Sequence, residues 1–239
     1  EASKFADLWI SVKQGNDTAL AMAMGHVILR EFYVERQAQY FQDYVRQYTD
    51  MPMLVRLVQQ DGKLVPDRLL RASDFAGNLG ESNNPEWKTV AYDETSGEIV
   101  VPNGSVGFRW GEKGKWNLEE KDSKGRETRL RLTLADTKDE LADVAFPYFG
   151  NREHDHFVGT EHPSVLERKV PAKKVKLADG EALVATVFDL FLANYGVDRG
   201  FGGKHAAKSY DDNEPYTPAW AEKITGVPRD QIITVAREF

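Results

Sequence analysis

The stretch with the clearest chemical potential is WISVKQGNDTALAMAMGHVILREF, residues 9–32. It joins a short β-branched run to a helix-like run through a turn made of Gly15, Asn16 and Asp17. A strand that enters a helix through a glycine-containing turn brings backbone N–H groups and the positive helix end to one place. We expect such a turn to suit a phosphate or a ribose hydroxyl, because Gly15 permits close approach of a ligand to the backbone.

In this interpretation Asp17 would accept hydrogen bonds from a ribose or from the edge of a guanine. The same residues are also typical of an ordinary helix N-cap, which requires no ligand. The stretch lacks the GxGxxG pattern of Rossmann dinucleotide sites, so that particular motif gives no support. Both alternatives, a ligand-binding turn and a plain cap, stay open from the spacing alone.

Three histidines, His154, His156 and His162, lie in a loop-like segment and have the chemistry of metal ligands. No cysteine stands nearby to strengthen a metal site, and Glu153 and Asp155 already supply local partners. We therefore interpret the three as solvated loop histidines and predict no zinc site, without assigning them a role.

Other polar residues have simpler structural explanations. His26 follows Gly25 in a helix-like run, so we expect it to be packed and hydrogen-bonded, with the glycine explained by close packing. His205 stands in a Gly/Lys loop with nothing to pair it. The acid pairs at 119–120 and 211–212 are interpreted as solvated carboxylates, since neither lies in an apolar run.

A basic and aromatic cluster, Trp110, Lys113, Lys115 and Trp116, lies in a predicted hairpin at 104–118. It has the composition to contact a partner subunit or an anion. A hairpin held by its tryptophans explains the same residues.

The composition restricts the class of protein. The chain has 239 residues, a net charge of −7 and no cysteine. An acidic chain lacks the basic face of a general nucleic-acid binder, so no nucleic-acid polymer is expected as a partner. Without cysteine the chain supplies no disulfide or thiolate ligand. No apolar run is long enough to span a bilayer, so direct membrane insertion is not expected.

The periodicity predicts the elements that must position these residues. We expect an α/β fold with a mostly parallel, three-layer, Rossmann-like core and an antiparallel β insertion at about 85–135. Strands are predicted at 8–13 and 53–59, with a hairpin over 173–187 about Asp179-Gly180. Helices are predicted at 17–32, 36–47, 137–144, 187–195, 218–225 and 228–238.

The chain begins with Glu1 and stops at Phe239 within a helical pattern. We interpret it as a fragment of a larger multidomain subunit.

Several strings carry a resemblance to a known family. They are WISVKQGNDTALAMAMGHVILREF, YVRQYTDMPMLV, NNPEWKTVAY, PNGSVGFRWGEKGKWNLE and SYDDNEPYTPAWAEKITGVPRDQIITVAREF. The first resembles the strand–turn–helix segment of the molybdopterin oxidoreductases, the dimethyl sulfoxide reductase family. Together, from near residue 5 to residue 239, they resemble the catalytic (alpha) subunits of membrane-bound respiratory nitrate reductases.

This resemblance implies a molybdenum enzyme that reduces nitrate to nitrite in anaerobic respiration. It implies a bis-molybdopterin guanine dinucleotide with molybdenum and a [4Fe–4S] cluster in the parent protein. It further implies an iron–sulfur beta subunit and a haem-containing membrane subunit as partners, with the complex on the cytoplasmic side of the cell membrane. Residues 1–239 would then be part of the region that binds a molybdopterin guanine dinucleotide.

The family's Gly-Thr-Asp turn maps onto Gly15, Asn16 and Asp17, with asparagine in place of threonine. The cluster ligands and the molybdenum-bound aspartate of the family precede this segment, so no catalytic or metal-binding position is assigned here, and the chain alone is expected to be inactive. Two alternatives stay open: a related enzyme acting on chlorate, perchlorate or selenate, and a purely structural or interaction module.

Overall fold

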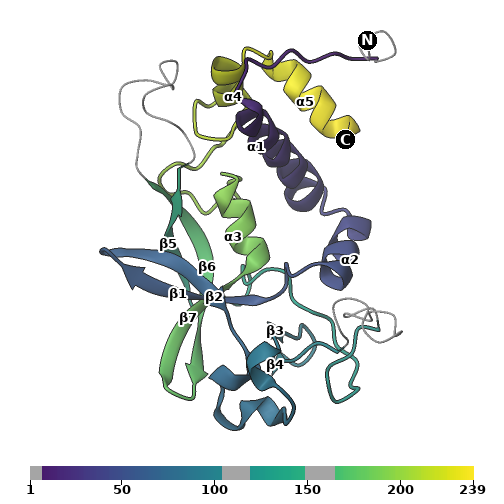
Figure 1. Cartoon of the computed structure of the whole chain (residues 1–239), viewed down its shortest axis with the longest axis vertical. Helices are drawn as coiled ribbons and strands as arrows, with labels where there is room; N and C mark the ends of the chain where they lie inside the picture. The colour runs from purple at the N-terminus through teal and green to yellow at the C-terminus, as the bar shows by residue number, and fades with distance from the viewer. Residues whose placement is uncertain (1–6, 104–118, 149–164) are drawn as a thin grey trace. The chain divides into compact units, whose positions relative to one another are not determined.

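The computed structural model describes residues 7–103, 119–148 and 165–239 (Figure 1). The chain divides into two compact units. We call residues 38–145 and 169–191 the barrel unit, and residues 1–37, 146–168 and 192–239 the helical unit.

Five strands close a small barrel in the order β1-β2-β5-β6-β7. The pairs β1/β2, β1/β7 and β6/β7 are antiparallel, and β2/β5 is parallel, through Leu64 and Val144. The strands are β1 (Leu54–Gln60), β2 (Lys63–Leu69), β5 (Glu140–Pro147), β6 (Val165–Leu177) and β7 (Gly180–Thr186).

Two tight turns explain why the barrel is mainly antiparallel. Asp61 and Gly62 join β1 to β2 with φ of 52° and 75°, the left-handed conformation that two-residue hairpin turns require. Ala178 and Asp179 join β6 to β7 in an equally short connection, and Gly180 begins β7 at a φ of 143°. Such connections are too short for the crossover that parallel neighbours need.

The prediction of a mostly parallel, Rossmann-like core is therefore wrong. The hairpin predicted about Asp179-Gly180 is confirmed and is itself antiparallel. The helix predicted at 137–144 is also wrong, because β5 covers this stretch. There Ala142 and Val144 are buried while Asp143 is exposed, which is the two-residue alternation of a strand. Residues 8–13 form no strand.

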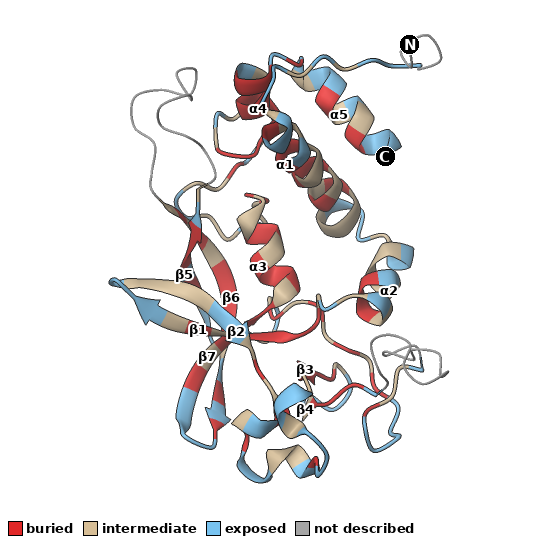
Figure 2. Ribbon diagram, viewed as in Figure 1, coloured by how far each residue is buried: buried red, intermediate tan, exposed pale blue. Residues whose placement is uncertain are grey.

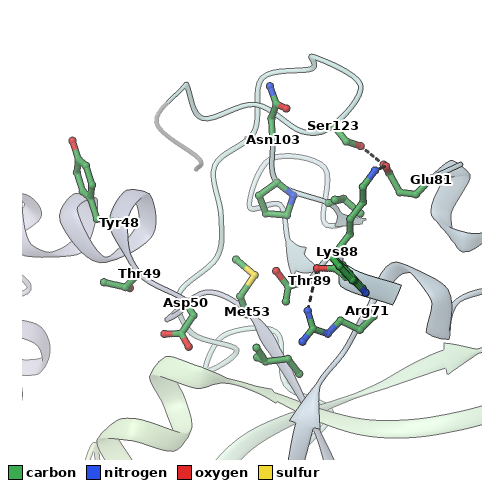
Figure 3. Close-up of a pocket in the computed structure, with 14 residues that line it drawn as sticks. Tyr48, Thr49, Asp50, Met53, Arg71, Glu81, Lys88, Thr89, Asn103 and Ser123 are labelled. Carbon is green, nitrogen blue, oxygen red and sulfur yellow. Dashed lines mark hydrogen bonds and ion pairs between the residues drawn. The ribbon is translucent and has the colours of Figure 1, made fainter. Parts of the chain in front are cut away.

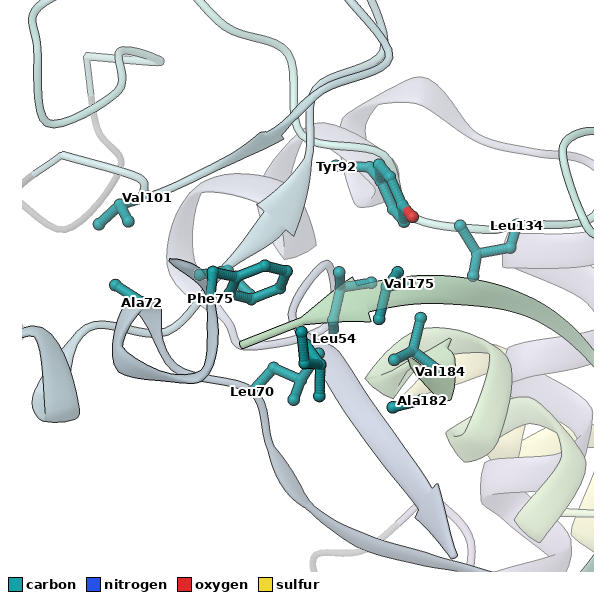
Figure 4. Packing of buried hydrophobic residues seen from close by; sticks show 12 residues of the cluster. Leu54, Leu70, Ala72, Phe75, Tyr92, Val101, Leu134, Val175, Ala182 and Val184 are labelled. Carbon is teal, nitrogen blue, oxygen red and sulfur yellow. The ribbon is translucent and has the colours of Figure 1, made fainter. Parts of the chain in front are cut away.

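The barrel unit is held by a cluster of buried apolar side chains (Figure 4). Leu54, Leu70 and Val184 are fully buried, so strands from both hairpins contribute to one core. The members are Leu54, Leu70, Ala72, Phe75, Val90, Tyr92, Val101, Leu134, Val175, Leu177, Ala182 and Val184.

Short elements surround this core. Between residues 85 and 135 the described residues form the two-stranded ladder β3/β4 and isolated bridges such as Asp93 with Leu130. The short elements of the barrel unit are α2 (Gln39–Tyr48), β3 (Ala91–Tyr92), β4 (Ile99–Val100) and the 3₁₀ turns η3 (Ala72–Asp74), η4 (Ala76–Gly80) and η5 (Pro85–Trp87). Helix α3 (Val187–Asn194) follows β7 directly.

The helical unit is built on α1 (Asp17–Ile28), which packs against α4 (Pro218–Thr225) and α5 (Arg229–Glu238). In Figure 2, α1 is pale blue only near its start and otherwise alternates between red and tan, so one face of the helix is buried and the other is partly exposed. The helix continues as a π-helical turn, η2 (Leu29–Glu35). Thr217 caps α4 by accepting a hydrogen bond from the Trp220 amide at 3.1 Å.

The expectation that Gly25 allows close packing is confirmed. A Cβ at this position would overlap the ring of Tyr195. Gly25 is therefore required by the neighbour rather than by its backbone conformation.

We predict that Gly25→Ala destabilises the protein by about 1–3 kcal/mol, because the added methyl group overpacks this contact. At an uncrowded helix position the same change would stabilise by roughly 1 kcal/mol, so the sign itself tests the contact. Thermal and urea unfolding would measure the difference. In a Tyr195→Ala background the penalty should vanish, and a penalty of the same size there would contradict the explanation.

Candidate functional site

The turn made of Gly15, Asn16 and Asp17 leads into α1, as the sequence predicts. Gly15 has a φ of 81°, in the left-handed region where glycine is favoured. The Asn16 amide donates to the carbonyl oxygen of Lys13 at 3.2 Å, which closes the turn. A Cβ at Gly15 would meet no atom within 4 Å, so the space beside the turn is open.

Asn16 is the N-cap residue of α1, but its side chain does not cap the helix. Its amide instead donates to the Gln14 carbonyl at 3.4 Å. Its backbone carbonyl accepts from the Ala19 amide at 3.1 Å, which starts the helix. The first N–H groups of a helix have no intrahelical acceptor, and here the cap side chain satisfies none of them. The exposed carboxylate of Asp17 lies beside this positive end.

The turn is fixed against the end of α4. The Lys13 amide donates to the carbonyl oxygen of Thr225 at 3.0 Å. Gly226 ends α4 in the left-handed conformation, with a φ of 75°. The Lys13 side chain covers this glycine, because a Cβ there would lie 3.0 Å from Lys13 Cε.

His26 is fully buried on the inner face of α1. Its Nδ1 lies 2.7 Å from the carbonyl oxygen of Tyr195, so Nδ1 carries the proton and donates it. Burial lowers the pKa of His26 to about 4, and the charges of Arg30 and Arg168 act in the same direction. The expectation that His26 is packed and hydrogen-bonded is confirmed.

The π-helical turn η2, which continues α1, is held in place by the buried carboxylate of Glu31. Glu31 is 4% exposed and accepts hydrogen bonds from Arg237 Nη2 at 2.7 Å and from the Tyr210 hydroxyl at 3.1 Å. Arg36 adds a third donor at 3.2 Å. The hydrogen bonds from Arg237 outweigh the effect of burial and keep the pKa of Glu31 below its usual value. This cluster joins η2 to α5.

Arg168 is the central buried cation of the helical unit. Its guanidinium donates to the carbonyl oxygens of Asn194 at 2.8 Å, Ala193 at 3.0 Å, His205 at 3.0 Å and Pro215 at 3.2 Å. Burial lowers the pKa of Arg168 to about 10, which still leaves it charged at neutral pH.

The barrel unit contains a separate cavity of about 780 Å³ (Figure 3). Its apolar wall includes Met53, while Lys88 and Ser123 both donate to the buried carboxylate of Glu81. Burial opposes ionisation of this carboxylate, but the bonds from Lys88 and Ser123 hold the pKa of Glu81 below its usual value. Sequence reasoning missed this cavity, because its polar residues are far apart along the chain.

The remaining residues singled out in the sequence are either outside the described ranges or differ from the prediction. His154, His156 and His162, and the cluster at 110–116, lie outside the described residues. The prediction that nothing pairs His205 is wrong, since its Nδ1 lies 3.5 Å from the Glu214 carboxylate.

The two acids at 211–212 are not simply solvated, because both interact with neighbouring residues. Asp211 pairs with Arg229 at 2.5 Å. Asp212 accepts from the amides of Lys208 and Ser209 at 2.7 and 3.1 Å.

Among the described residues, no group of three or more His, Asp or Glu side chains is placed to hold a metal ion. Within the same ranges no helix combines the length and the apolar character needed to cross a membrane.

Comparison with known proteins gives one consistent result. The chain is 59% identical to "Respiratory nitrate reductase 1 alpha chain" of Escherichia coli (strain K12), across all of this chain and 19% of that protein. It is 44% identical to "Nitrate reductase alpha chain" of Bacillus subtilis (strain 168), across all of this chain and 18% of that protein. Identity to "Perchlorate reductase subunit alpha" of Dechloromonas aromatica (strain RCB) is 28%, across 98% of this chain and 18% of that protein. No protein-family model matches the chain.

The burial of His26 predicts a pH dependence of stability. Its pKa is about 4 in the folded protein and about 6.5 when unfolded, so the unfolded chain binds an extra proton between these values. The contribution of neutral His26 to the free energy of unfolding is fully present above pH 6.5. It is lost as the pH falls toward 4, and the total loss is roughly 3 kcal/mol. Urea unfolding of wild type and His26→Gln between pH 7 and 5 should show a flatter profile for the variant. Parallel profiles would contradict the burial of a neutral imidazole.

Proposed function

Because this chain corresponds over its whole length to a segment of the respiratory nitrate reductase alpha chains, about a fifth of their length, we propose that it serves in nitrate reduction. The parent protein would be the molybdenum-containing catalytic subunit, which reduces nitrate to nitrite with quinol-derived electrons. The observation that supports this is the 59% identity over all of the chain, against 28% to a perchlorate reductase subunit. A perchlorate- or chlorate-reducing parent is the second candidate, and the lower identity disfavours it.

For the segment itself, we propose that Gly15, Asn16 and Asp17 bind the guanosine or phosphate end of a molybdopterin guanine dinucleotide. Residues 1–239 would form part of the region that holds this cofactor. The described residues fit such a group in two ways: the space beside Gly15 is open, and the Asn16 side chain leaves the first helix N–H groups uncapped. Backbone N–H groups at a helix start suit phosphate oxygens.

In this arrangement the protein orients the cofactor, and the molybdenum centre supplies the oxygen-atom transfer when it is bound. The Gly15 turn would accept the anionic phosphate, and the Asp17 carboxylate would accept N–H or O–H groups of the guanosine. The hydrogen bond from Lys13 to Thr225 would hold the turn in place during turnover.

The remaining parts of the proposal concern the parent protein. A [4Fe–4S] cluster would be bound outside this segment, which has no cysteine. An iron–sulfur beta subunit and a haem-containing membrane subunit would be the partners, with the complex on the cytoplasmic side of the membrane.

We predict that Asp17→Ala in the full-length subunit weakens retention of the cofactor, because one acceptor for the guanosine is lost. The molybdenum and guanine contents of the purified enzyme should fall together, and Asp67→Ala in the barrel unit, also an exposed carboxylate, should leave both unchanged. Wild-type molybdenum and guanine contents in the Asp17→Ala enzyme would remove the basis for this site.

A second prediction concerns the 239-residue chain alone. It should not reduce nitrate with a reduced dye as donor, because the proposal puts the cluster and molybdenum ligands elsewhere in the parent. An assay of dye oxidation together with elemental analysis would test this. Turnover accompanied by stoichiometric molybdenum would show that the segment carries the catalytic centre itself.

A further inference from the structure

Helix α2 presents a row of exposed tyrosines, which we call the tyrosine ridge: Tyr40, Tyr44 and Tyr48. Their exposed fractions are 75%, 50% and 56%. The three are spaced by four residues, so they lie along one side of the helix over about 12 Å. The rings of Tyr44 and Tyr48 stack with centroids 5.0 Å apart, which makes the ridge continuous. Figure 2 shows exposed and buried positions alternating along α2.

The orientation of the ridge is fixed from the other side of the helix. Val45 and Arg46 are buried there. Arg46 donates to the Leu130 carbonyl at 3.0 Å and pairs with Glu94 at 3.3 Å. Turning the ridge inward would break these contacts, so the tyrosines remain on the surface of the barrel unit.

The exposed aromatic surface extends beyond α2. Tyr48 and Trp87 both line the cavity of the barrel unit, and Trp87 is 71% exposed. Tyrosine and tryptophan are enriched in the centre of protein interfaces, and grouped exposed aromatics are uncommon on surfaces that face only water. The ridge and Trp87 therefore have the composition of a contact surface.

The shape of the ridge indicates what covers it. A row at positions i, i+4 and i+8 is the kind of ridge that packs into the groove between side chains of a second helix. We infer that a helix from the part of the alpha chain outside these 239 residues packs across the tyrosine ridge, presenting small and aliphatic side chains to the rings. The relatives support this source, because about four-fifths of their length lies outside the matched segment.

A helix of the same polypeptide is also favoured by its tether, which raises its effective concentration over that of a separate subunit. The inference rests on the alpha-chain relationship and not on the nucleotide proposal. The two can fail separately, since the ridge lies in the barrel unit and Gly15 in the helical unit.

The test uses the full-length alpha chain in the complex from which it is purified. p-Benzoylphenylalanine replaces Tyr40, Tyr44 or Tyr48 in turn, the sample is irradiated, and crosslinked peptides are identified by mass spectrometry. A Tyr44→Phe enzyme is the matched control for tolerance of a changed ring. Unirradiated samples control for crosslinks that form without light.

All three positions should crosslink to a single stretch of the alpha chain outside residues 1–239, with attachment sites three to four residues apart. The mass of the subunit on a denaturing gel should not change, because the link is internal. A crosslink to another polypeptide, a doubled mass from a second copy, or a link within residues 1–239 would overturn the inference. So would recovery of unreacted probe alone at all three positions.

Discussion

The contact between Gly25 and the Tyr195 ring sets how closely α1 approaches the chain that follows α3. The next residue, His26, donates to the Tyr195 carbonyl, so one short stretch of α1 is fixed both by packing and by a hydrogen bond. The position of α1 determines where its first turn lies. The proposed ligand site at Gly15 therefore depends on a contact that lies nearly three helical turns away from it.

Buried charges hold the helical unit in two different ways. Glu31 is neutralised by arginines, whereas Arg168 is surrounded by backbone carbonyl oxygens. Removing either side chain would leave buried polar groups without partners, which costs more than the intact bond contributes. Arg168 also donates hydrogen bonds to backbone carbonyl oxygens of loops that do not pair as β-strands. This explains how irregular segments near Pro215 and His205 are held without strands.

The two units divide the proposed roles between them. The turn at Gly15 is an exposed helix start, suited to an anionic ligand. The barrel unit instead offers the tyrosine ridge and a cavity in which Lys88 pairs with Glu81 and which Arg71 and Asp50 also line. The two proposals therefore concern different units: a ligand at the Gly15 turn in the helical unit, and a polypeptide contact at the tyrosine ridge in the barrel unit.

The sequence by itself determined the local elements and the candidate turn. The start of α1 at Asp17, helices α3, α4 and α5, and the Asp179-Gly180 hairpin all follow from capping residues, turn residues and periodicity. Only the tertiary structure decided that the strands close into a barrel, that 140–147 is a strand, and that Arg168 and Glu31 are buried. Strand partners and buried charges depend on residues far apart in the chain, because a hydrogen-bonded ladder or a desolvated ion pair exists only once those distant segments meet.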